Sequence, residues 1–489
     1  MEGPLYLPEL RQSIVVSGLT LLLVTAFVIS TAFFDKSPSL KAARWGDSIG
    51  TKARQNALLT SSKSIYLENY WKDSAFGQTE KLVVPPKYLD ELRRLPHSIL
   101  SFEDAHSESP VTKYTDTPPP KFFRIVPHVT KARLTPSLTR LVPTLSAEAD
   151  QIIPLELGQC KEWTPVNIHH RIMRIIAVLA GRVFIGPELC HDERYIDAAI
   201  NYTIEFSKAS QDIEGLSPWL RPFVARRVRS VIALREREHS FVAFLTPIIH
   251  ARRKASDEGQ RLPDDMLTWL MEEPARDNSA VDIRHIARTQ LALFAVAFHT
   301  TALTATNVFY DHAVNRNSGG VLTSASLQRL VKLDSFMKES LRFHPLSIAT
   351  FQRRVLTPFT LSDGHYVPKH IIIEVATHAI TRDPEFFPDP EVFHPWRFTG
   401  TRDEGRNQFA SISGMLGTFG FGPHACPGRF FAAVVLKIVI ANIIMGYDVG
   451  IPMKEGEVGE RYKNLDFGLM SNPDTSKAIL LKRADEGDV

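Results

Sequence analysis

The first pattern in the chain is a run of 21 residues without a charged side chain, from Ile14 to Phe34. At a rise of 1.5 Å per residue, a helix of this length spans roughly 30 Å, the thickness of the bilayer hydrocarbon core. The residues before the run include Glu2 and Glu9, and Phe33-Phe34 ends it. A cleaved signal peptide instead has a basic leader, a shorter apolar core and small residues at its end. The pattern therefore predicts a transmembrane anchor at residues 14–34.

The charges on either side of this run predict its orientation. Arg11 is the only basic residue before it, whereas the residues after it include Lys36, Lys41, Arg44, Lys52 and Arg54. Because loops rich in Lys and Arg stay on the cytosolic side, we expect a lumenal N-terminus at 1–13 and a cytosolic body. We interpret residues 35–59 as a linker and residues 60–489 as one large domain.

Two later apolar stretches compete for the transmembrane assignment. Residues 289–310 carry His299 and five threonines, and residues 430–447 carry Lys437 near their middle. A lysine at the bilayer centre costs roughly 2.5–3.5 kcal/mol on insertion scales. We therefore expect both stretches to be buried helices of the body.

The pattern of the body predicts a mainly α fold with small β-sheets. Helical periodicity dominates residues 128–345, and the charged stretch 252–277 is expected to be a solvated loop with one short helix at 266–271. Residues 350–375 change to alternating apolar runs around an Asp-Gly turn, which indicates a hairpin.

Composition excludes several classes of protein. The chain has 489 residues, with 57 Lys and Arg against 54 Asp and Glu, a net charge of +3. This balance argues against a nucleic-acid-binding protein, whose affinity depends on neutralising phosphates. Three cysteines, Cys160, Cys190 and Cys426, are too few for a disulfide framework or a cysteine-rich zinc site. The body is therefore expected in a reducing compartment.

The strongest local motif is the glycine-rich stretch GTFGFGPHACPGRFFA at 417–432. Gly420-Phe-Gly422 fits the start of a dinucleotide-binding fingerprint, but such a fingerprint follows a β-strand and opens a βαβ unit. Cys426 suggests another chemistry, because backbone N–H groups of a turn and a helix start stabilise a thiolate. A lone thiolate is unsuited to zinc, which takes about four ligands, and suits haem iron. Cys160 and Cys190 are expected to be inert.

The spacing of the residues around Cys426 resembles a known signature. Phe419-x-x-Gly422-x-x-x-Cys426-x-Gly428 is similar to the F-x-x-G-x-x-x-C-x-G sequence of the cytochrome P-450 family of haem-thiolate monooxygenases. His424 stands where that family has a basic residue. The resemblance implies that Cys426 binds the haem iron and that the other four residues contact the haem.

Further segments extend the resemblance. Glu339 and Arg342 form an E-x-x-R pair, and Arg397 lies in a segment similar to the family's P-E-R-F sequence. The resemblance implies a buried ionic triad of these three residues, in which every charge must be paired.

The haem propionates require cations. The resemblance implies Arg133 from a degenerate W-x-x-x-R segment, with His128 as an alternative, and Arg354 from a later segment, with Arg353 as its neighbour.

The segment that crosses the oxygen site in the family reads Val296-Ala297-Phe298-His299-Thr300-Thr301 here. The resemblance implies that Thr300 contacts the bound oxygen and helps to deliver protons, and that His299 replaces the family's acid. His299 either relays protons or only packs, and the sequence favours neither. By resemblance, the residues that line the substrate site are Ala297, Phe298, Thr301, the loop 104–120, Leu346 with the rest of 346–350, and Met470 with the rest of 467–470.

The resemblance implies a membrane-bound fungal monooxygenase of secondary metabolism, on the cytosolic face of the endoplasmic reticulum. Its cofactor is haem, and NADPH electrons arrive through a separate cytochrome P-450 reductase, with cytochrome b5 as a second candidate donor. Its expected substrate is a bulky hydrophobic terpenoid or indole-diterpenoid, and its other partners are membrane lipids, with no nucleic acid. Alternatives are a rearrangement or dehydration on the same fold, a nicotinamide dehydrogenase and a membrane-anchored structural protein.

Overall fold

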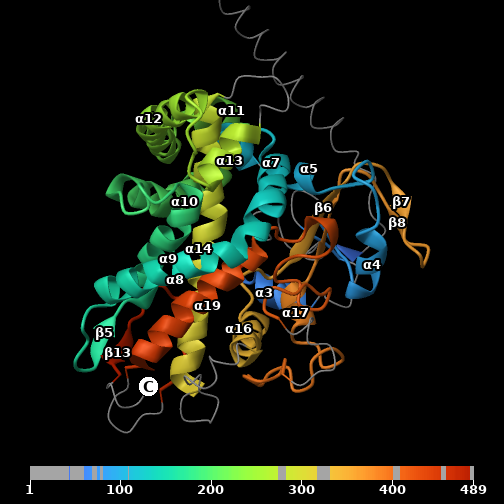
Figure 1. Ribbon diagram of the computed structural model, residues 1–489. Helices are drawn as coiled ribbons and strands as arrows, with labels where there is room; N and C mark the ends of the chain where they lie inside the picture. Colours follow the sequence, from blue (N-terminus) through green and yellow to red (C-terminus); the bar gives the residue numbers. More distant parts are fainter. Residues whose placement is uncertain are drawn as a thin grey trace, which may run out of the picture.

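Figure 1 shows the computed structural model of the chain. The predicted anchor at 14–34 and the terminus at 1–13 lie outside the described residues, as does most of the predicted linker. Two residues of that linker form a short strand, β1 (Ala43–Arg44), which pairs in parallel with β2 (Ser74–Phe76). The structure describes residues 43–44, 60–68, 74–76, 81–107, 110–217, 219–273, 282–315, 331–399, 408–452 and 459–484.

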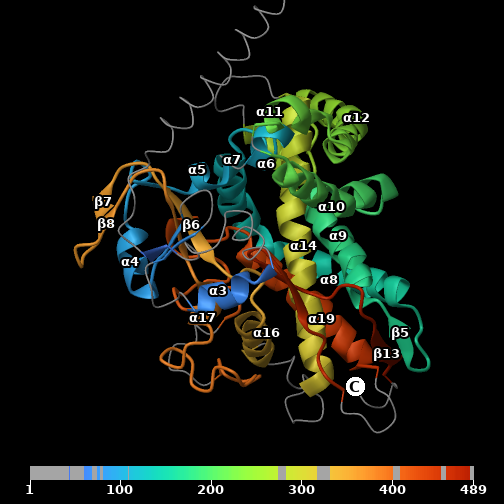
Figure 2. The same cartoon turned by 180° about the vertical axis from the view of Figure 1, so that it is seen from behind.

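The larger part of the molecule is helical and is built around α14, a helix of 33 residues (Ile283–Asn315). Figures 1 and 2 show α14 running through this part, with α8, α9, α10 and α12 on one side and α19 crossing it. The other helices of this part are α7 (Phe122–Val129), the π-helix η2 (Thr130–Leu134), α8 (Thr135–Leu157), α9 (Ile168–Phe184), α10 (Glu193–Gly215), α11 (Arg221–Val224), η3 (Ala225–Arg227), α12 (Arg229–Asp257), α13 (Met266–Glu272), α16 (Val331–Phe343) and α19 (Arg429–Gly446).

A smaller part, rich in β-structure, lies on the other side of α14 (Figures 1 and 2). Its six-stranded sheet has the order β1-β2-β3-β9-β6-β4. The remaining strands of this sheet are β3 (Lys81–Val83), β4 (Leu100–Ser101), β6 (Thr350–Val355) and β9 (Ile372–Val375). The short helices of this part are α3 (Ser62–Glu68), η1 (Pro86–Tyr88), α4 (Leu89–Leu92), α5 (Phe102–Ser107), α17 (Thr377–Ile380) and η6 (Gly422–His424). The short helix α6 (Pro110–Thr115) packs against α10 and α12 of the helical part.

The predicted hairpin is present. The Asp363-Gly364 turn joins β7 (Phe359–Thr360) to β8 (Tyr366–Val367), and Gly364 has a φ of +92°, a conformation that glycine adopts readily. Two further small sheets contain β5 (Thr164–Val166), β10 (Tyr447–Gly450) and β13 (Ile479–Arg483), and β11 (Asn464–Phe467) with β12 (Met470–Pro473).

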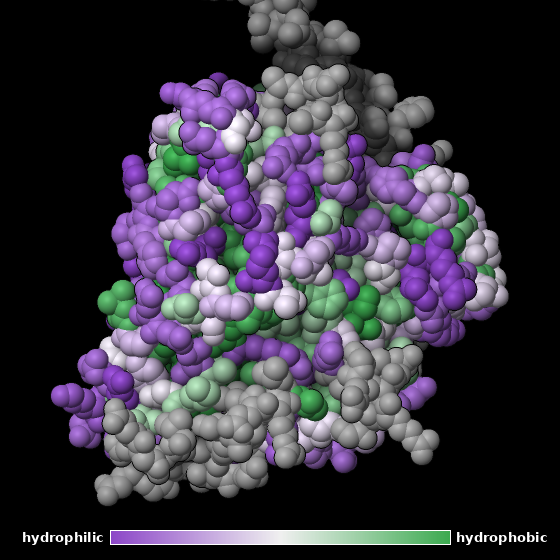
Figure 3. Space-filling model, viewed as in Figure 1, coloured by the Kyte–Doolittle hydropathy of each residue, from purple (hydrophilic) through white to green (hydrophobic). Residues whose placement is uncertain are grey.

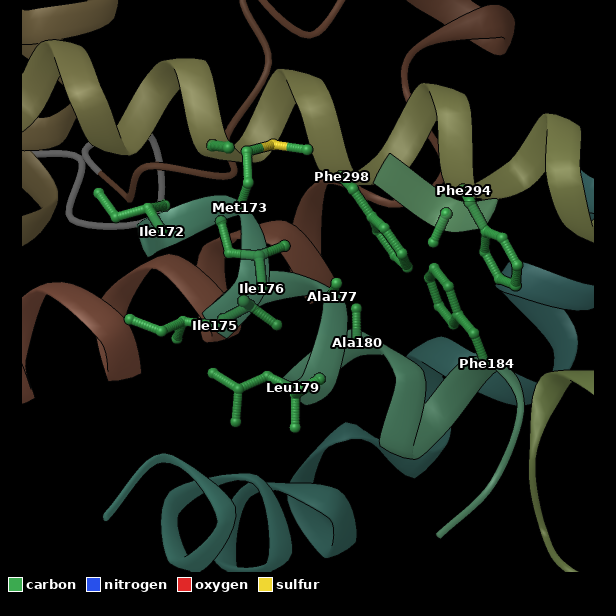
Figure 4. Close-up of a cluster of buried hydrophobic side chains, with 14 of the residues drawn as sticks. Ile172, Met173, Ile175, Ile176, Ala177, Leu179, Ala180, Phe184, Phe294 and Phe298 are labelled. Carbon is green, nitrogen blue, oxygen red and sulfur yellow. The ribbon is translucent and has the colours of Figure 1, made fainter. Parts of the chain in front are cut away.

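The main hydrophobic core fills the space between the helices. Figure 4 shows one region of it, where apolar side chains of α9 meet Phe294 and Phe298 of α14. Phe184 stacks against both phenylalanines, with ring centroids 6.4 and 5.8 Å away. A second cluster lies around the six-stranded sheet and α17. Apolar burial of this extent is the dominant stabilising contribution to such a fold.

Both apolar stretches expected to be buried belong to core helices. By length and composition alone, α14 and α19 could cross a membrane, but 67% of the most apolar window of α14 is buried, and α19 packs against α8 and α14. The corresponding fraction for α19 is 39%. In Figure 3 hydrophobic residues appear among polar ones in the middle of the molecular face. On α19, Phe430 and Met445 remain partly exposed.

The expectation for residues 252–277 is wrong at its start. α12 continues to Asp257, and Arg252 is 5% exposed rather than solvated. Arg252 Nη1 and Nη2 donate to the two carboxylate oxygens of Asp265 at 2.7 and 2.8 Å, and Nη2 also donates to Glu188 at 2.6 Å. The charge is buried because its partners come from elsewhere in the chain. The short helix predicted at 266–271 is α13.

The structure brings Glu339, Arg342 and Arg397 together. Arg342 Nε and Nη2 donate to the two carboxylate oxygens of Glu339 at 2.8 and 2.9 Å, and Arg397 Nε donates to the same oxygens at 3.1 and 3.0 Å. Glu339 and Arg342 are both 0% exposed. Arg342 Nη1 also donates to the carbonyls of Thr381 and Pro390 at 2.7 and 2.9 Å. The triad therefore fixes α16 against the loops that follow α17.

Replacing Arg342 with alanine is expected to destabilise the fold strongly. The change leaves the buried Glu339 carboxylate with one cation instead of two, and breaking a buried ion pair costs roughly 3–5 kcal/mol. We expect Arg342→Ala protein to be aggregated and free of haem, measured as soluble yield and haem content. Arg94→Ala is the control, because Glu91 and Arg94 share the E-x-x-R spacing but Arg94 is exposed. Soluble, haem-loaded Arg342→Ala protein would show that the triad is dispensable.

Candidate functional site

The loop before α19 wraps the backbone around Cys426. Gly417, Gly420 and Gly422 all have positive φ values, of 58°, 71° and 75°. The N–H of Cys426 donates to the carbonyl of Phe419 at 2.7 Å and closes the turn. No strand precedes Gly420 within the described residues 408–419, so the dinucleotide-binding interpretation lacks the strand that it requires.

Two opposing effects act on the Cys426 thiol. Burial raises its pKa, while the N–H groups of Gly428 and Arg429 and the charge of Arg429 lower it. The expected stabilisation of a thiolate by the helix start is therefore present but is smaller than the effect of burial in the protein alone. A buried thiolate needs a cation as its partner, and a metal ion bound by the sulfur would supply one.

Positions 422 and 428 of the signature are glycine for different structural reasons. A Cβ added at Gly422 would lie 2.9 Å from Cβ of Arg93, and the positive φ adds strain, so the protein itself requires glycine there. A Cβ added at Gly428 would meet no protein atom within 4 Å. Gly428 therefore borders open space beside Cys426, where a flat ligand can approach the backbone.

One face of α14 is solvent-accessible in the middle of the helix. Val296 is 54% exposed and Thr300, one turn later, is also exposed, although the flanking turns are buried. Thr300 Oγ1 donates to the carbonyl of Val296 at 2.9 Å, and Thr304 Oγ1 donates to that of Thr300 at 2.8 Å. The exposed Thr300 hydroxyl therefore keeps its lone pairs available to a ligand, whereas Thr304 is buried.

The predicted substrate residues on α14 point in different directions. Thr301 Oγ1 donates to the carbonyl of Ala297 at 2.6 Å, and both residues lie next to the exposed face. Phe298 is 0% exposed and stacks on Phe294 at 5.2 Å, within the core shown in Figure 4. The structure thus separates Phe298 from the predicted substrate site, since successive helix positions are about 100° apart.

His299 connects α14 to α10. Its Nε2 lies 2.9 Å from the carbonyl oxygen of Ile200, which can only accept, so Nε2 carries the proton. Burial lowers the pKa of His299, and the bond to Ile200 opposes this shift. The neutral ring therefore donates to α10 and not to Thr300, a geometry that favours a packing role over proton relay.

The other predicted substrate segments meet one another. Ile348 N–H donates to the carbonyl of Leu469 at 2.8 Å, and Ser471 N–H donates to that of Leu346 at 3.1 Å. Met470 is 42% exposed at the turn of the β11–β12 hairpin. The predicted loop 104–120 instead contains the helices α5 and α6. Segments 346–350 and 467–470 therefore form one unit.

Basic side chains gather around His424. Its ring stacks on Phe102, with centroids 5.1 Å apart. Burial and the neighbouring charges of Arg353, His97, Lys131 and His106 lower the pKa of His424 to about 4. Arg353 Nη1 donates to the carbonyl of Gln352 at 2.8 Å, and burial lowers the pKa of its guanidinium to about 10. Such a cluster fits an anionic ligand.

The residues that act on His424 differ from the two predicted propionate ligands. Arg133 Nη2 donates to Glu272 on α13, and its side chain is half exposed. Arg354 alternates with Arg353 along β6, and Arg353 is the more buried of the two. The cations that act on His424 are therefore Lys131 and Arg353. Lys131 lies two residues before Arg133 in the π-helix η2. Residues two apart on a helix point in different directions, so a comparison of the helix faces could have identified Lys131.

Together these residues fit a haem group. Cys426 offers one thiolate ligand, Gly428 leaves room for a flat ring, and the cations around His424 match two carboxylates. A family model described as Cytochrome P-450 matches residues 128–478.

The chain belongs to the cytochrome P-450 family.

Characterised relatives carry the same family name. The chain is 35% identical to the P-450 monooxygenase ATR3 of Stachybotrys chlorohalonatus, over 84% of this chain and 90% of the relative. It is 32% identical to paxP of Penicillium paxilli over 84% of each chain. It is 31% identical to janP of Penicillium janthinellum over 88% of each chain. This P-450 is thus a monooxygenase similar to those fungal enzymes.

A second cluster of potential metal ligands has a structural explanation. Glu148, Cys190 and His191 place ligand atoms within 4.8 Å of one another. However, His191 Nε2 is 2.6 Å from Glu148 Oε1, and Arg182 Nε is 3.9 Å from Oε2. Burial raises the pKa of Cys190 to about 11. The carboxylate already has basic partners and the thiol is protonated, which agrees with an inert Cys190.

Cys426→Ala is expected to abolish thiolate ligation in this P-450. The reduced, carbon monoxide-bound protein should show the long-wavelength Soret band of a thiolate ligand, and the variant should lack it. Cys160→Ala and Cys190→Ala are the controls and should keep the band. A normal band in Cys426→Ala would exclude this residue as the iron ligand.

Arg353→Ala should weaken haem retention more than Arg354→Ala. Arg353 faces the basic cluster, and a charge-assisted hydrogen bond contributes roughly 1.5–3 kcal/mol. Haem transfer from Arg353→Ala to apomyoglobin should therefore be about tenfold faster than from the unchanged protein. Arg354→Ala should differ little. Equal rates for the two variants would contradict the assignment of Arg353.

Proposed function

We propose that this P-450 oxidises a bulky hydrophobic small molecule of fungal secondary metabolism, of the terpenoid or indole-diterpenoid class. The observation that carries the oxygenase assignment is the cysteine loop combined with the exposed Val296–Thr300 face of α14. The substrate class is supported by the largely apolar residues around this face and by the similarity to fungal monooxygenases.

The protein's contribution is to hold the cofactor and to control protons and water. When bound, haem with a cysteine thiolate ligand supplies dioxygen activation and the oxidation of unreactive C–H bonds. Cys426 would hold the iron, and Arg353, Lys131 and His424 would hold the propionates. The main-chain turn closed by Phe419 fixes the sulfur.

Thr300 is the proposed proton-handling residue. Its hydroxyl donates to the carbonyl of Val296 and can accept at Oγ1 from water or a ligand. Rotation about its side chain would turn the same proton towards the site. His299 is proposed to hold α10 against α14 beside Thr300, through the carbonyl of Ile200. The presence of Thr300 favours oxygenation over the rearrangement or dehydration alternative, because neither of those reactions delivers protons to bound dioxygen.

The proposal includes the cellular setting. We infer that NADPH electrons reach the protein through a separate reductase, with cytochrome b5 as a second donor, and that residues 14–34 anchor it in the endoplasmic reticulum with the body in the cytosol. The 21-residue uncharged run and the basic residues after it support this topology. Deletion of residues 1–34 should release the protein from microsomes.

Thr300→Ala should divert NADPH electrons to hydrogen peroxide. Loss of the hydroxyl removes a group that controls protons, whereas ligand binding depends mainly on the apolar surroundings. We expect the peroxide formed per NADPH consumed to rise severalfold, with the substrate-induced Soret shift nearly unchanged. Thr306→Ser is a control on the same helix, because Thr306 is buried away from this face. Unchanged peroxide yield in Thr300→Ala would favour the alternative without oxygen insertion.

The same measurement separates the two roles of His299. If it only packs, His299→Ala should lower the melting temperature and leave the peroxide yield unchanged, because it loses the bond to Ile200. If it relays protons, the peroxide yield should rise and His299→Asp should lower it again. The geometry leads us to expect the first result.

A further inference from the structure

Phe102 lies where the six-stranded sheet passes into α5, and strand pairing places it beside Arg353. β4 runs antiparallel to β6, with Ser101 opposite Arg354. The next pair in this register is Phe102 opposite Arg353. Ser101 Oγ accepts from the N–H of Asp104 at 3.0 Å, so the strand ends and α5 begins here. The backbone therefore carries the ring of Phe102 to the position of Arg353.

Two phenylalanine rings contact the guanidinium of Arg353. Its Cζ lies 5.1 Å from the ring centroid of Phe102 and 4.4 Å from that of Phe351. Both distances are within the range of a cation–π interaction, about 6 Å. Arg353 and Phe351 are two residues apart on the buried face of β6, and Arg353 is 6% exposed. The rings therefore give a buried cation favourable contacts that an aliphatic surface would lack.

The same ring of Phe102 stacks on the imidazole of His424. The two centroids are 5.1 Å apart, and the ring planes differ by 15°. His424 ends η6, two residues before Cys426. A histidine ring offers an N–H donor in either of its neutral tautomers. Phe102 therefore contacts one hydrogen-bond donor from β6 and another from the cysteine loop.

Electrostatic attraction does not hold these two donors together. Besides burial, the charge of Arg353 lowers the pKa of His424, so the two groups are close and disfavour positive charge on one another. The ring of Phe102 is neutral and offers favourable contacts to both groups. It can therefore keep them side by side while no anion is bound.

We propose that Phe102 is a positioning residue for the cofactor, whose ring holds Arg353 and His424 in place as donors to the cofactor's carboxylates. This inference rests on the proposed function, because those carboxylates are the propionates of the haem that Cys426 would bind. With the donors already in place, cofactor binding does not have to order a long, flexible arginine side chain. Phe102 therefore acts on haem retention through Arg353 and His424.

The test measures haem transfer from the full-length, haem-loaded protein to excess apomyoglobin. Phe102→Leu keeps an apolar side chain and removes the ring. We expect transfer to become about three- to tenfold faster, the effect of one lost cation–π or stacking contact. Phe102→Tyr keeps the ring and should differ from the unchanged protein by less than about twofold.

A double-mutant cycle shows whether Phe102 acts through Arg353. In Arg353→Ala protein the ring has already lost this partner, so Phe102→Leu should speed haem transfer by about twofold or less. If the ring only stabilised the fold around it, Phe102→Leu would instead change the rate by the same factor in both backgrounds.

Phe123→Leu is the matched control. Phe123 meets Phe102 edge-on, with centroids 5.4 Å apart, so this change removes a neighbouring ring of the same cluster. The rings that contact the guanidinium and the imidazole remain. We expect Phe123→Leu to lower the melting temperature and to leave the transfer rate unchanged.

Three results would overturn the positioning role: an unchanged rate in Phe102→Leu, equal acceleration in Phe123→Leu, or the same factor with and without Arg353. Folded Phe102→Leu protein that takes up no haem, beside haem-loaded Phe123→Leu, would be a stronger form of the expected result. A missing thiolate Soret band in the unchanged protein would instead refute the proposed function.

Discussion

A guanidinium that is fully enclosed by protein, as in Arg342, remains charged only where protein atoms replace its contacts with water. Its acceptors are the Glu339 carboxylate and backbone carbonyls from the loops that follow α17. A second buried charge on α16, Asp334, holds the segments on either side of the cysteine loop. Asp334 accepts from the N–H of Phe409, at the start of the cysteine loop, at 3.0 Å. It also accepts from Lys437 of α19, the helix that follows this loop, at 2.8 Å. The position of Cys426 thus depends on charges buried along α16.

Local motifs in the sequence predicted the parts of the site that lie within one turn or one loop. The cysteine turn and the Asp-Gly hairpin have their determining contacts within a few residues. The E-x-x-R spacing also occurs at the exposed Arg94, so that pair gained its meaning from the family resemblance and not from spacing alone. Arg397 was assigned by resemblance to the family's P-E-R-F segment, and its Nε lies 3.1 Å from Glu339 Oε1. The mainly α fold followed from the dominant helical periodicity.

The direction in which a side chain points was harder to predict than its position along the chain. Phe298, His299 and Thr300 are consecutive, yet one joins the core, one bonds to α10 and one lies on the exposed face. The choice between Arg353 and Arg354 depends on which face of the strand each side chain occupies. The burial of Arg252 depends on Glu188, a partner far away in the chain. A linear motif specifies residue order, whereas the side-chain direction is set by helix phase and by segments far away in the chain.

The basic cluster around His424 also has a consequence for how the protein matures. Arg353 and Lys131 bring positive charge to this part of the folded chain, and a dicarboxylate ligand would supply the opposite charge. Because the ligand interacts with the native arrangement and not with the unfolded chain, folding and cofactor capture are thermodynamically linked. The cellular level of the enzyme is then expected to follow haem supply, since chains that fail to capture it populate the unfolded state and enter the degradation pathway.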